Sequence, residues 1–90
     1  MRYVLFYEAA EDFRAKAPML FLAHRARFLE FHADGTLQMV GAFTDAEGGA
    51  MGVFTTREAA LDFATGDPFV LGDVVRRWYI REWNEVFAEP

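Results

Sequence analysis

The sequence predicts an α+β fold of the ferredoxin-like type, in which two helices cover one face of a four-stranded antiparallel sheet. Three observations predict it. Strand-like and helix-like apolar patterns follow one another in the order β-α-β-β-α-β. The first and last strands are apolar on both faces, so part of the sheet needs a cover that two helices cannot supply. The 90 residues suffice for a single domain, which we expect to span residues 1–90.

The first half of the chain predicts one strand and one long helix. Residues 2–7, RYVLFY, are β-branched and aromatic, as is typical of a strand, whereas residues 8–17 have no clear pattern. Pro18 is tolerated in the first turn of a helix and Gly35 is a typical residue after its end, so the helix is expected between them. His24 falls on the apolar face of this helix.

The middle of the chain predicts a hairpin followed by a short helix. Residues 36–43 and 50–55 form its two strands, and residues 44–49, TDAEGG, form its turn. Thr55 lies three residues before a glutamate, which is the capping-box pattern of a helix start, and Gly66 marks the end of that helix.

The last strand is predicted over residues 74–87, where apolar side chains alternate between both faces. Two helices leave one face of the sheet open, and a large apolar face is a liability in a monomer. We therefore expect a homodimer in which two copies pack sheet against sheet.

Composition narrows the class of protein. Fourteen acidic and nine basic residues give a net charge of −5, and the basic residues are scattered, so no nucleic-acid partner is expected. The chain has no cysteine, which excludes disulfides and thiolate chemistry. The apolar run near the N-terminus is too short for a signal peptide or a membrane span. A cytoplasmic protein without a membrane partner is the expectation.

Two residues are candidates for chemistry, and each has a structural alternative. His24 is either a histidine at the edge of the core or an acid–base residue that faces an apolar pocket. Asp67 precedes Pro68, so it is either the N-cap of a short helical turn or part of a site. His24 and His32 lie eight residues apart, about 12 Å along a helix, which does not suit one metal ion. No phosphate-binding loop occurs, and neither a metal nor a cofactor is expected.

Several short motifs, taken together in order, resemble the YCII-related (YciI-like) family over nearly the full length. They are YVLFY, HRARFLEFHADGTL, VGAF, the acidic and glycine-containing turn, DPF, and the ending REWNEVF. The resemblance implies a dimeric α+β barrel of ferredoxin-like subunits with an active-site pair that maps onto His24 and Asp67. Family members often have GPF where this chain has Ala42 between glycine and phenylalanine. The wall of the active-site pocket is therefore expected to differ in shape at this position.

Two functions follow as hypotheses. The first is a cofactor-independent enzyme, an isomerase or an elimination-type lyase, that moves a proton in a small aromatic or unsaturated substrate. His24 would be the acid–base and Asp67 would orient it. The expected pocket wall consists of Phe28, Phe43, Pro68 and Phe69. The alternative is a non-enzymatic dimer that binds a small molecule or a partner protein.

Overall fold

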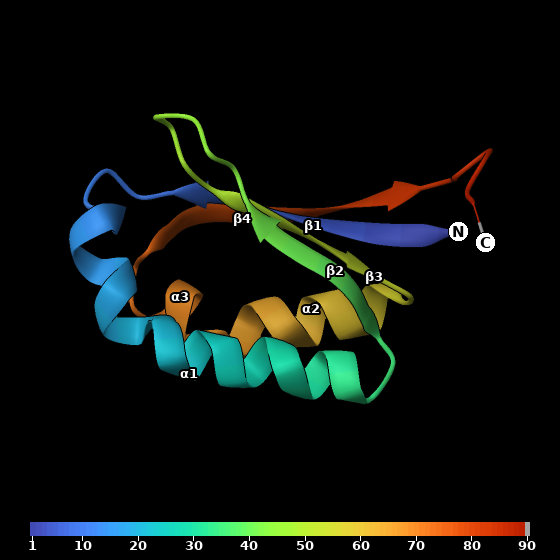
Figure 1. Cartoon of the computed structure of the whole chain (residues 1–90), viewed down its shortest axis with the longest axis horizontal. Coiled ribbons are helices and arrows are strands. Elements are labelled where there is room, and N and C mark those ends of the chain that lie inside the picture. The colour runs from blue at the N-terminus through green and yellow to red at the C-terminus, as the bar shows by residue number, and fades with distance from the viewer. Residues whose placement is uncertain (90) are drawn as a thin grey trace.

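The computed structural model describes residues 1–89 and has the predicted α+β architecture (Figure 1). The elements are β1 (Arg2–Ala9), α1 (Phe13–Ala33), β2 (Leu37–Ala42), β3 (Ala50–Phe54), α2 (Arg57–Gly66), α3 (Pro68–Leu71) and β4 (Val75–Trp83). The strands pair antiparallel in the order β2-β3-β1-β4. The three helices of the described part of the chain lie on one face of the sheet (Figure 1). The ferredoxin-like prediction is therefore confirmed, with α3 as a short addition.

The core lies between the sheet and the helices and is built around aromatic rings. Phe54 of β3 and Phe63 of α2 are fully or almost fully buried, and their ring centroids lie 5.5 Å apart. Phe31 of α1 packs edge-on against Phe63 at 5.2 Å. These three rings join one strand and two helices, which fixes both helices against the sheet.

The other face of the sheet also carries apolar side chains, and no helix of residues 1–89 covers it (Figure 1). Leu5 and Tyr7 point into the core, so Phe6 points the opposite way, as the alternation along a strand requires. The cross-strand partners of Phe6 are Met51 and Tyr79, and the Phe6 and Tyr79 rings stack at 5.2 Å. The predicted two-sided apolar character of β1 is present.

Helix α1 begins earlier than predicted, at Phe13 and not at Pro18. Residues 13–17, FRAKA, contain good helix formers, and this local preference extends the helix beyond the proline. Pro18 therefore lies inside the helix, and the first turns bend away from the axis of the rest (Figure 1). Although α1 has 21 residues, no helix within residues 1–89 is long and apolar enough to cross a membrane.

Two other boundaries differ from the prediction. Helix α2 is capped by Thr56 and not by Thr55, since the Thr56 side chain accepts a hydrogen bond from the backbone N–H of Ala59 at 3.1 Å. Strand β4 ends at Trp83 and not at residue 87. Trp83 pairs with Arg2, the first residue of β1, so residues 84–89 extend past the end of the partner strand.

Candidate active site

Asp67 stands at the junction between α2 and α3. It is the C-cap of α2 and the N-cap of α3, and its carboxylate accepts a hydrogen bond from the backbone N–H of Phe69 at 3.2 Å. Pro68 is the first residue of α3, where its missing N–H costs nothing. The predicted capping role of Asp67 is confirmed, yet a cap is normally exposed and this side chain is 0% exposed. A buried carboxylate needs further donors.

Two side chains supply those donors. Nδ1 of His24, from α1, lies 2.8 Å from Oδ1 of Asp67, and the Tyr7 hydroxyl, from β1, donates to Oδ2 at 2.6 Å. With the Phe69 N–H, three donors surround one buried carboxylate. An ionised carboxylate has no proton to give, so His24 must carry its proton on Nδ1. The neutral ring then has an unprotonated Nε2, the nitrogen that can act as a base.

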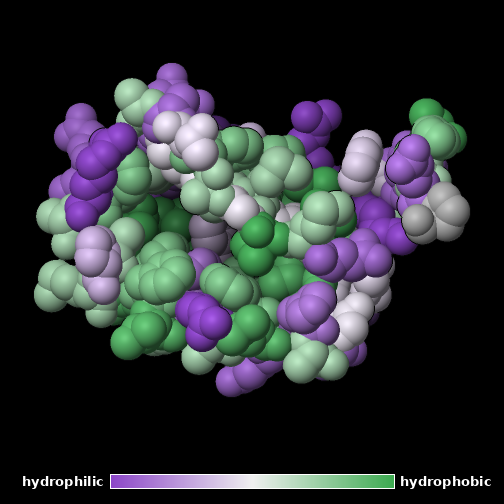
Figure 2. Space-filling model, viewed as in Figure 1, coloured by the Kyte–Doolittle hydropathy of each residue, from purple (hydrophilic) through white to green (hydrophobic). Residues whose placement is uncertain are grey.

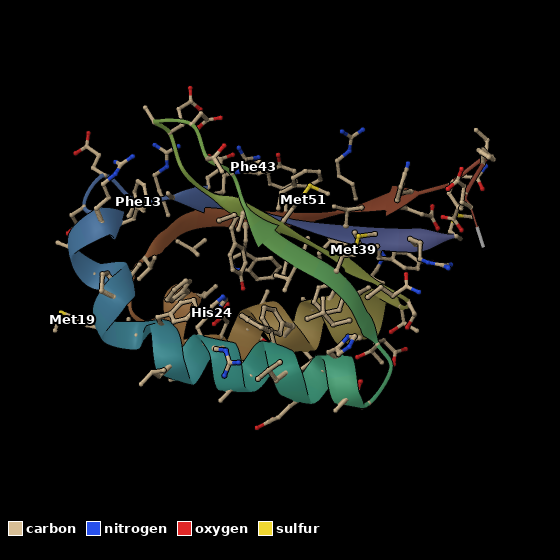
Figure 3. The ribbon with its side chains drawn as sticks, viewed as in Figure 1. Phe13, Met19, His24, Met39, Phe43 and Met51 are labelled. Atoms are coloured by element: carbon tan, nitrogen blue, oxygen red, sulfur yellow. The ribbon has the colours of Figure 1, made fainter. Side chains whose placement is uncertain are left out.

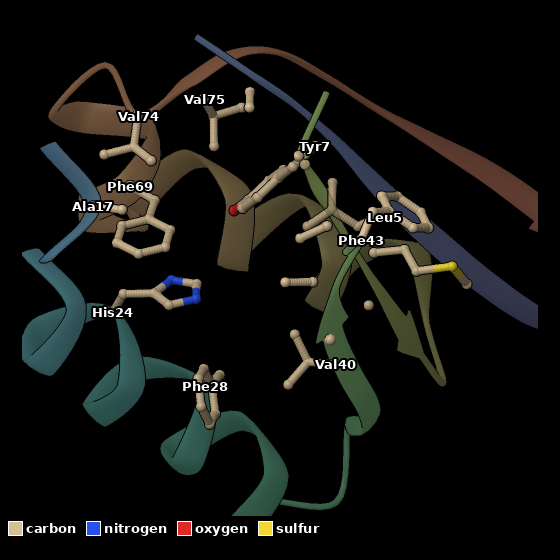
Figure 4. Close-up of a pocket in the computed structure, with 18 of the residues that line it drawn as sticks. Leu5, Tyr7, Ala17, His24, Phe28, Val40, Phe43, Phe69, Val74 and Val75 are labelled. Atoms are coloured by element: carbon tan, nitrogen blue, oxygen red, sulfur yellow. The ribbon is translucent and has the colours of Figure 1, made fainter. Parts of the chain in front are cut away.

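Aromatic rings hold the imidazole of His24 in place. It stacks on Phe69 with centroids 3.8 Å apart and an interplanar angle of 5°, and it meets the Phe28 ring edge-on at 5.3 Å. His24 points from α1 toward the sheet, whereas Met19 of the same helix points away (Figure 3). Within residues 1–89 no hydrogen bond occupies Nε2, which is directed into a cavity (Figure 4). The site thus presents a fixed basic nitrogen.

Tyr7 is a member of this site that sequence reasoning missed. Burial, reinforced by the neighbouring Asp67 carboxylate, raises the pKa of the Tyr7 hydroxyl far above its usual value. The phenol therefore stays protonated and keeps donating to Asp67. A tyrosine on a core-facing strand position was the available signal, because a buried phenolic hydroxyl needs a partner.

The cavity in front of His24 has a volume of about 410 Å³. It lies between α1 and the sheet, and the space-filling view shows apolar side chains around the hollow (Figure 2). Among the lining residues only His24 and Tyr7 have polar side chains. Such a cavity suits a small, mostly apolar ligand whose reacting atom meets the imidazole.

The structure places most of the predicted wall around this cavity. Phe28, Phe43 and Phe69 are among the lining residues, whereas Pro68 is not. Ala42, at the position of the family's frequent proline, lies in the wall formed by β2. No group of three or more histidine, aspartate or glutamate side chains suited to a metal ion occurs within residues 1–89.

Two glycines bring the hairpin loop close to the cavity. Gly49 has φ +89°, and a Cβ there would lie 2.5 Å from the backbone oxygen of Tyr7. Gly48 has φ +71°, and a Cβ there would lie 2.5 Å from the Phe13 ring. At both positions the positive φ favours glycine, and a larger side chain would have no room. The loop after β2 therefore packs directly on β1 and on the start of α1.

The chain belongs to the YCII-related domain family, whose sequence model matches residues 1–84. A comparison with curated protein sequences finds no match.

Solved structures of low identity share the fold. The 5-chloro-2-hydroxyhydroquinone dehydrochlorinase TftG from Burkholderia phenoliruptrix AC1100, in complex with 2,5-dihydroxybenzoquinone, has 15% identity and a TM-score of 0.77, over 93% of this chain and 94% of that one. The structured domain of Boca from Drosophila melanogaster has 10% identity and a TM-score of 0.58, over 93% and 100% of the two chains. Rv0793 from Mycobacterium tuberculosis has 17% identity and a TM-score of 0.53, over 96% and 97%.

Proposed function

We propose that the protein is a cofactor-independent enzyme that transfers a proton in a small aromatic or unsaturated substrate, as an isomerase or an elimination-type lyase. One observation carries the proposal: Nε2 of His24 faces an apolar cavity while Nδ1 is bound to the buried Asp67 carboxylate. A base held in one tautomer and in one orientation is what general base catalysis requires.

The proposed reaction begins when Nε2 of His24 takes a proton from a carbon of the bound substrate. The ring becomes an imidazolium, and the Asp67 carboxylate at 2.8 Å stabilises its charge. In an elimination, the electron pair of the broken C–H bond forms a double bond and the leaving group departs with its own bonding pair. In an isomerisation, the imidazolium returns the proton to another atom of the substrate. Tyr7 keeps the carboxylate in place throughout by donating to its second oxygen.

The dehydrochlorinase TftG gives this proposal limited support. That protein is named for loss of chloride from a ring compound and was solved with a quinone. At 15% identity the likeness shows the fold alone. What favours a ring-shaped ligand in this chain is its own cavity, in which Phe28, Phe43 and Phe69 supply flat apolar surfaces.

A direct assay uses two probes with a common product. 3-Chlorocyclohexanone yields cyclohex-2-enone by elimination, and cyclohex-3-enone yields it by isomerisation, so the absorbance of the conjugated enone reports both reactions. We expect the protein to accelerate one of them and His24→Gln to reduce that acceleration by about 10²- to 10⁴-fold, because the base is lost. His32→Gln is the matched control, since His32 lies outside the cavity lining and contacts the Leu37 carbonyl.

The same assay separates the enzyme from a ligand-binding module, which the apolar cavity also favours. Saturable binding of cyclohex-2-enone, with no acceleration of either reaction, would support a binding protein. An acceleration that survives in folded His24→Gln would remove His24 from the proposed mechanism.

We further propose that the protein works as a homodimer in which the open sheet faces pack together. Phe6, Met51 and Tyr79 lie on that face, and Met39 of the edge strand β2 is 66% exposed (Figure 3). Burial of these side chains favours association. Sedimentation velocity at micromolar concentration should give twice the 10.3 kDa chain mass. Met51→Glu should shift the protein to monomer, whereas a monomeric wild type would contradict the proposal.

A further inference from the structure

Arg27 connects α1 to the C-terminal end of α2. Its Nε donates to the backbone carbonyl of Phe63 at 3.1 Å, and its Nη2 donates to the carbonyl of Asp62 at 2.6 Å. Carbonyls near the end of a helix carry partial negative charge, so a guanidinium is a favourable partner there. Two hydrogen bonds from one rigid, planar group fix the distance and the relative rotation of the two helices.

Aromatic rings confine the same guanidinium. Its carbon lies 5.0 Å from the centroid of Phe31 and 5.7 Å from that of Phe63, within the range of cation–π interactions. Phe31 belongs to α1 and Phe63 to α2, so these contacts also bridge the two helices. Arg27 therefore has little freedom to move away from α2.

Gly66 leaves the space that the guanidinium occupies. A Cβ on Gly66 would lie 2.5 Å from Nη2 and 2.8 Å from Cζ of Arg27. No positive φ is involved at this glycine, so its role here is to provide room and not an unusual backbone conformation. Gly66 immediately precedes Asp67, so the guanidinium packs against the backbone that leads into the buried carboxylate.

We infer that Arg27 is a positioning residue that holds the His24–Asp67 pair in register. His24 and Arg27 are three residues apart and lie on the same side of α1. His24 reaches the Asp67 side chain, and Arg27 fixes the helix end just before Asp67. The Arg27 contacts thus set the separation between α1 and the end of α2. The 2.8 Å hydrogen bond between His24 and Asp67 depends on that separation. The inference deepens the proposed function and rests on it for the catalytic consequence alone.

The test compares Arg27→Ala with Arg25→Gln. Arg25 is exposed on the same helix, and its side chain makes no hydrogen bond or ion pair within residues 1–89, which makes it a suitable control. The primary measurement is the proton NMR signal of the His24 Nδ1–H, which is protected from exchange only while it is bonded to Asp67. We expect this signal to be lost in Arg27→Ala and unchanged in Arg25→Gln. In Arg27→Ala the acceleration of enone formation should also fall, by about 10- to 100-fold, because a small misplacement of the base lowers the rate strongly.

A second variant tests the contact itself. Gly66→Ala should lower Tm in the wild-type background, because the new methyl group displaces the guanidinium. In the Arg27→Ala background the same change should raise Tm by a few degrees, because alanine is the better helix residue once the space is empty. A change in Tm that reverses its sign between the two backgrounds is expected only where residues 27 and 66 are in direct contact.

The outcomes separate the two proposals. A folded Arg27→Ala with an intact Nδ1–H signal would overturn the positioning role, and so would Gly66→Ala with the same sign in both backgrounds. Loss of the signal without any catalysis by the wild type would retain the positioning role and refute the enzyme. If Arg27→Ala does not fold, Arg27→Lys, which keeps the charge but loses the two-pronged geometry, should weaken the signal while remaining folded.

Discussion

Replacing Asp67 with asparagine is expected to reduce the proposed catalysis by about 10²- to 10⁴-fold while the protein stays folded. The amide has nearly the shape of the carboxylate and caps a helix about as well. Its oxygen, at the place of Oδ1, can accept from both His24 and Phe69, and its NH₂, at the place of Oδ2, can donate to the hydroxyl of Tyr7. What is lost is the negative charge that stabilises the imidazolium during proton transfer.

Enone formation and thermal unfolding of Asp67→Asn should be measured together. Asp62→Asn is the control, since the side chain of Asp62 is exposed and only its backbone carbonyl takes part in a contact described above. A folded Asp67→Asn with the wild-type rate would show that the carboxylate is a cap and a structural partner only. The proposed pairing with His24 would then have no catalytic role.

Phe63→Ala is expected to lower the free energy of unfolding by about 3–5 kcal/mol. The side chain is 2% exposed and packs against Phe31 and Phe54, so its removal leaves a cavity where both helices meet the sheet. Domains of this size are typically stable by roughly 5–15 kcal/mol, so this single change takes a large part of the total.

Urea unfolding measures this loss, and Leu61→Ala on the same helix is the control. Leu61 is 45% exposed, so its truncation should cost well under half as much. A loss of less than about 1 kcal/mol for Phe63→Ala would contradict the aromatic core as the main link between the helices and the sheet.

The fold class could be predicted from local pattern because each element carries its own periodicity. The boundaries could not, since they depend on tertiary pairing or on competing preferences. Trp83 ends β4 because the partner strand ends there, which no pattern within residues 74–87 reveals. Pro18 indicates a helix start in general, but the helix formers before it extend α1 to Phe13.

In the candidate site, too, local pattern predicts individual residues but not their contacts. His24 was identified by its place on an apolar helix face and Asp67 by its place before a proline, and the resemblance to a family joined them. Their 2.8 Å contact spans 43 positions, so no local rule predicts it. Tyr7 and Arg27 were missed because the partners that define their roles lie 60 and about 35 positions away. A tyrosine in a strand and an arginine in a helix are common in proteins, so their residue type alone does not mark them as part of a site.

The proline inside α1 leaves that helix with one backbone hydrogen bond fewer beside the cavity. Pro18 cannot donate to the carbonyl of Arg14, so bending the helix there breaks fewer hydrogen bonds than bending it elsewhere. The segment before it carries Phe13, which packs on Gly48 of the hairpin loop, and both line the cavity. His24 lies beyond the bend and is held by the core. The Phe13–Gly48 contact and the basic nitrogen of His24 thus line one cavity from opposite sides of the bend.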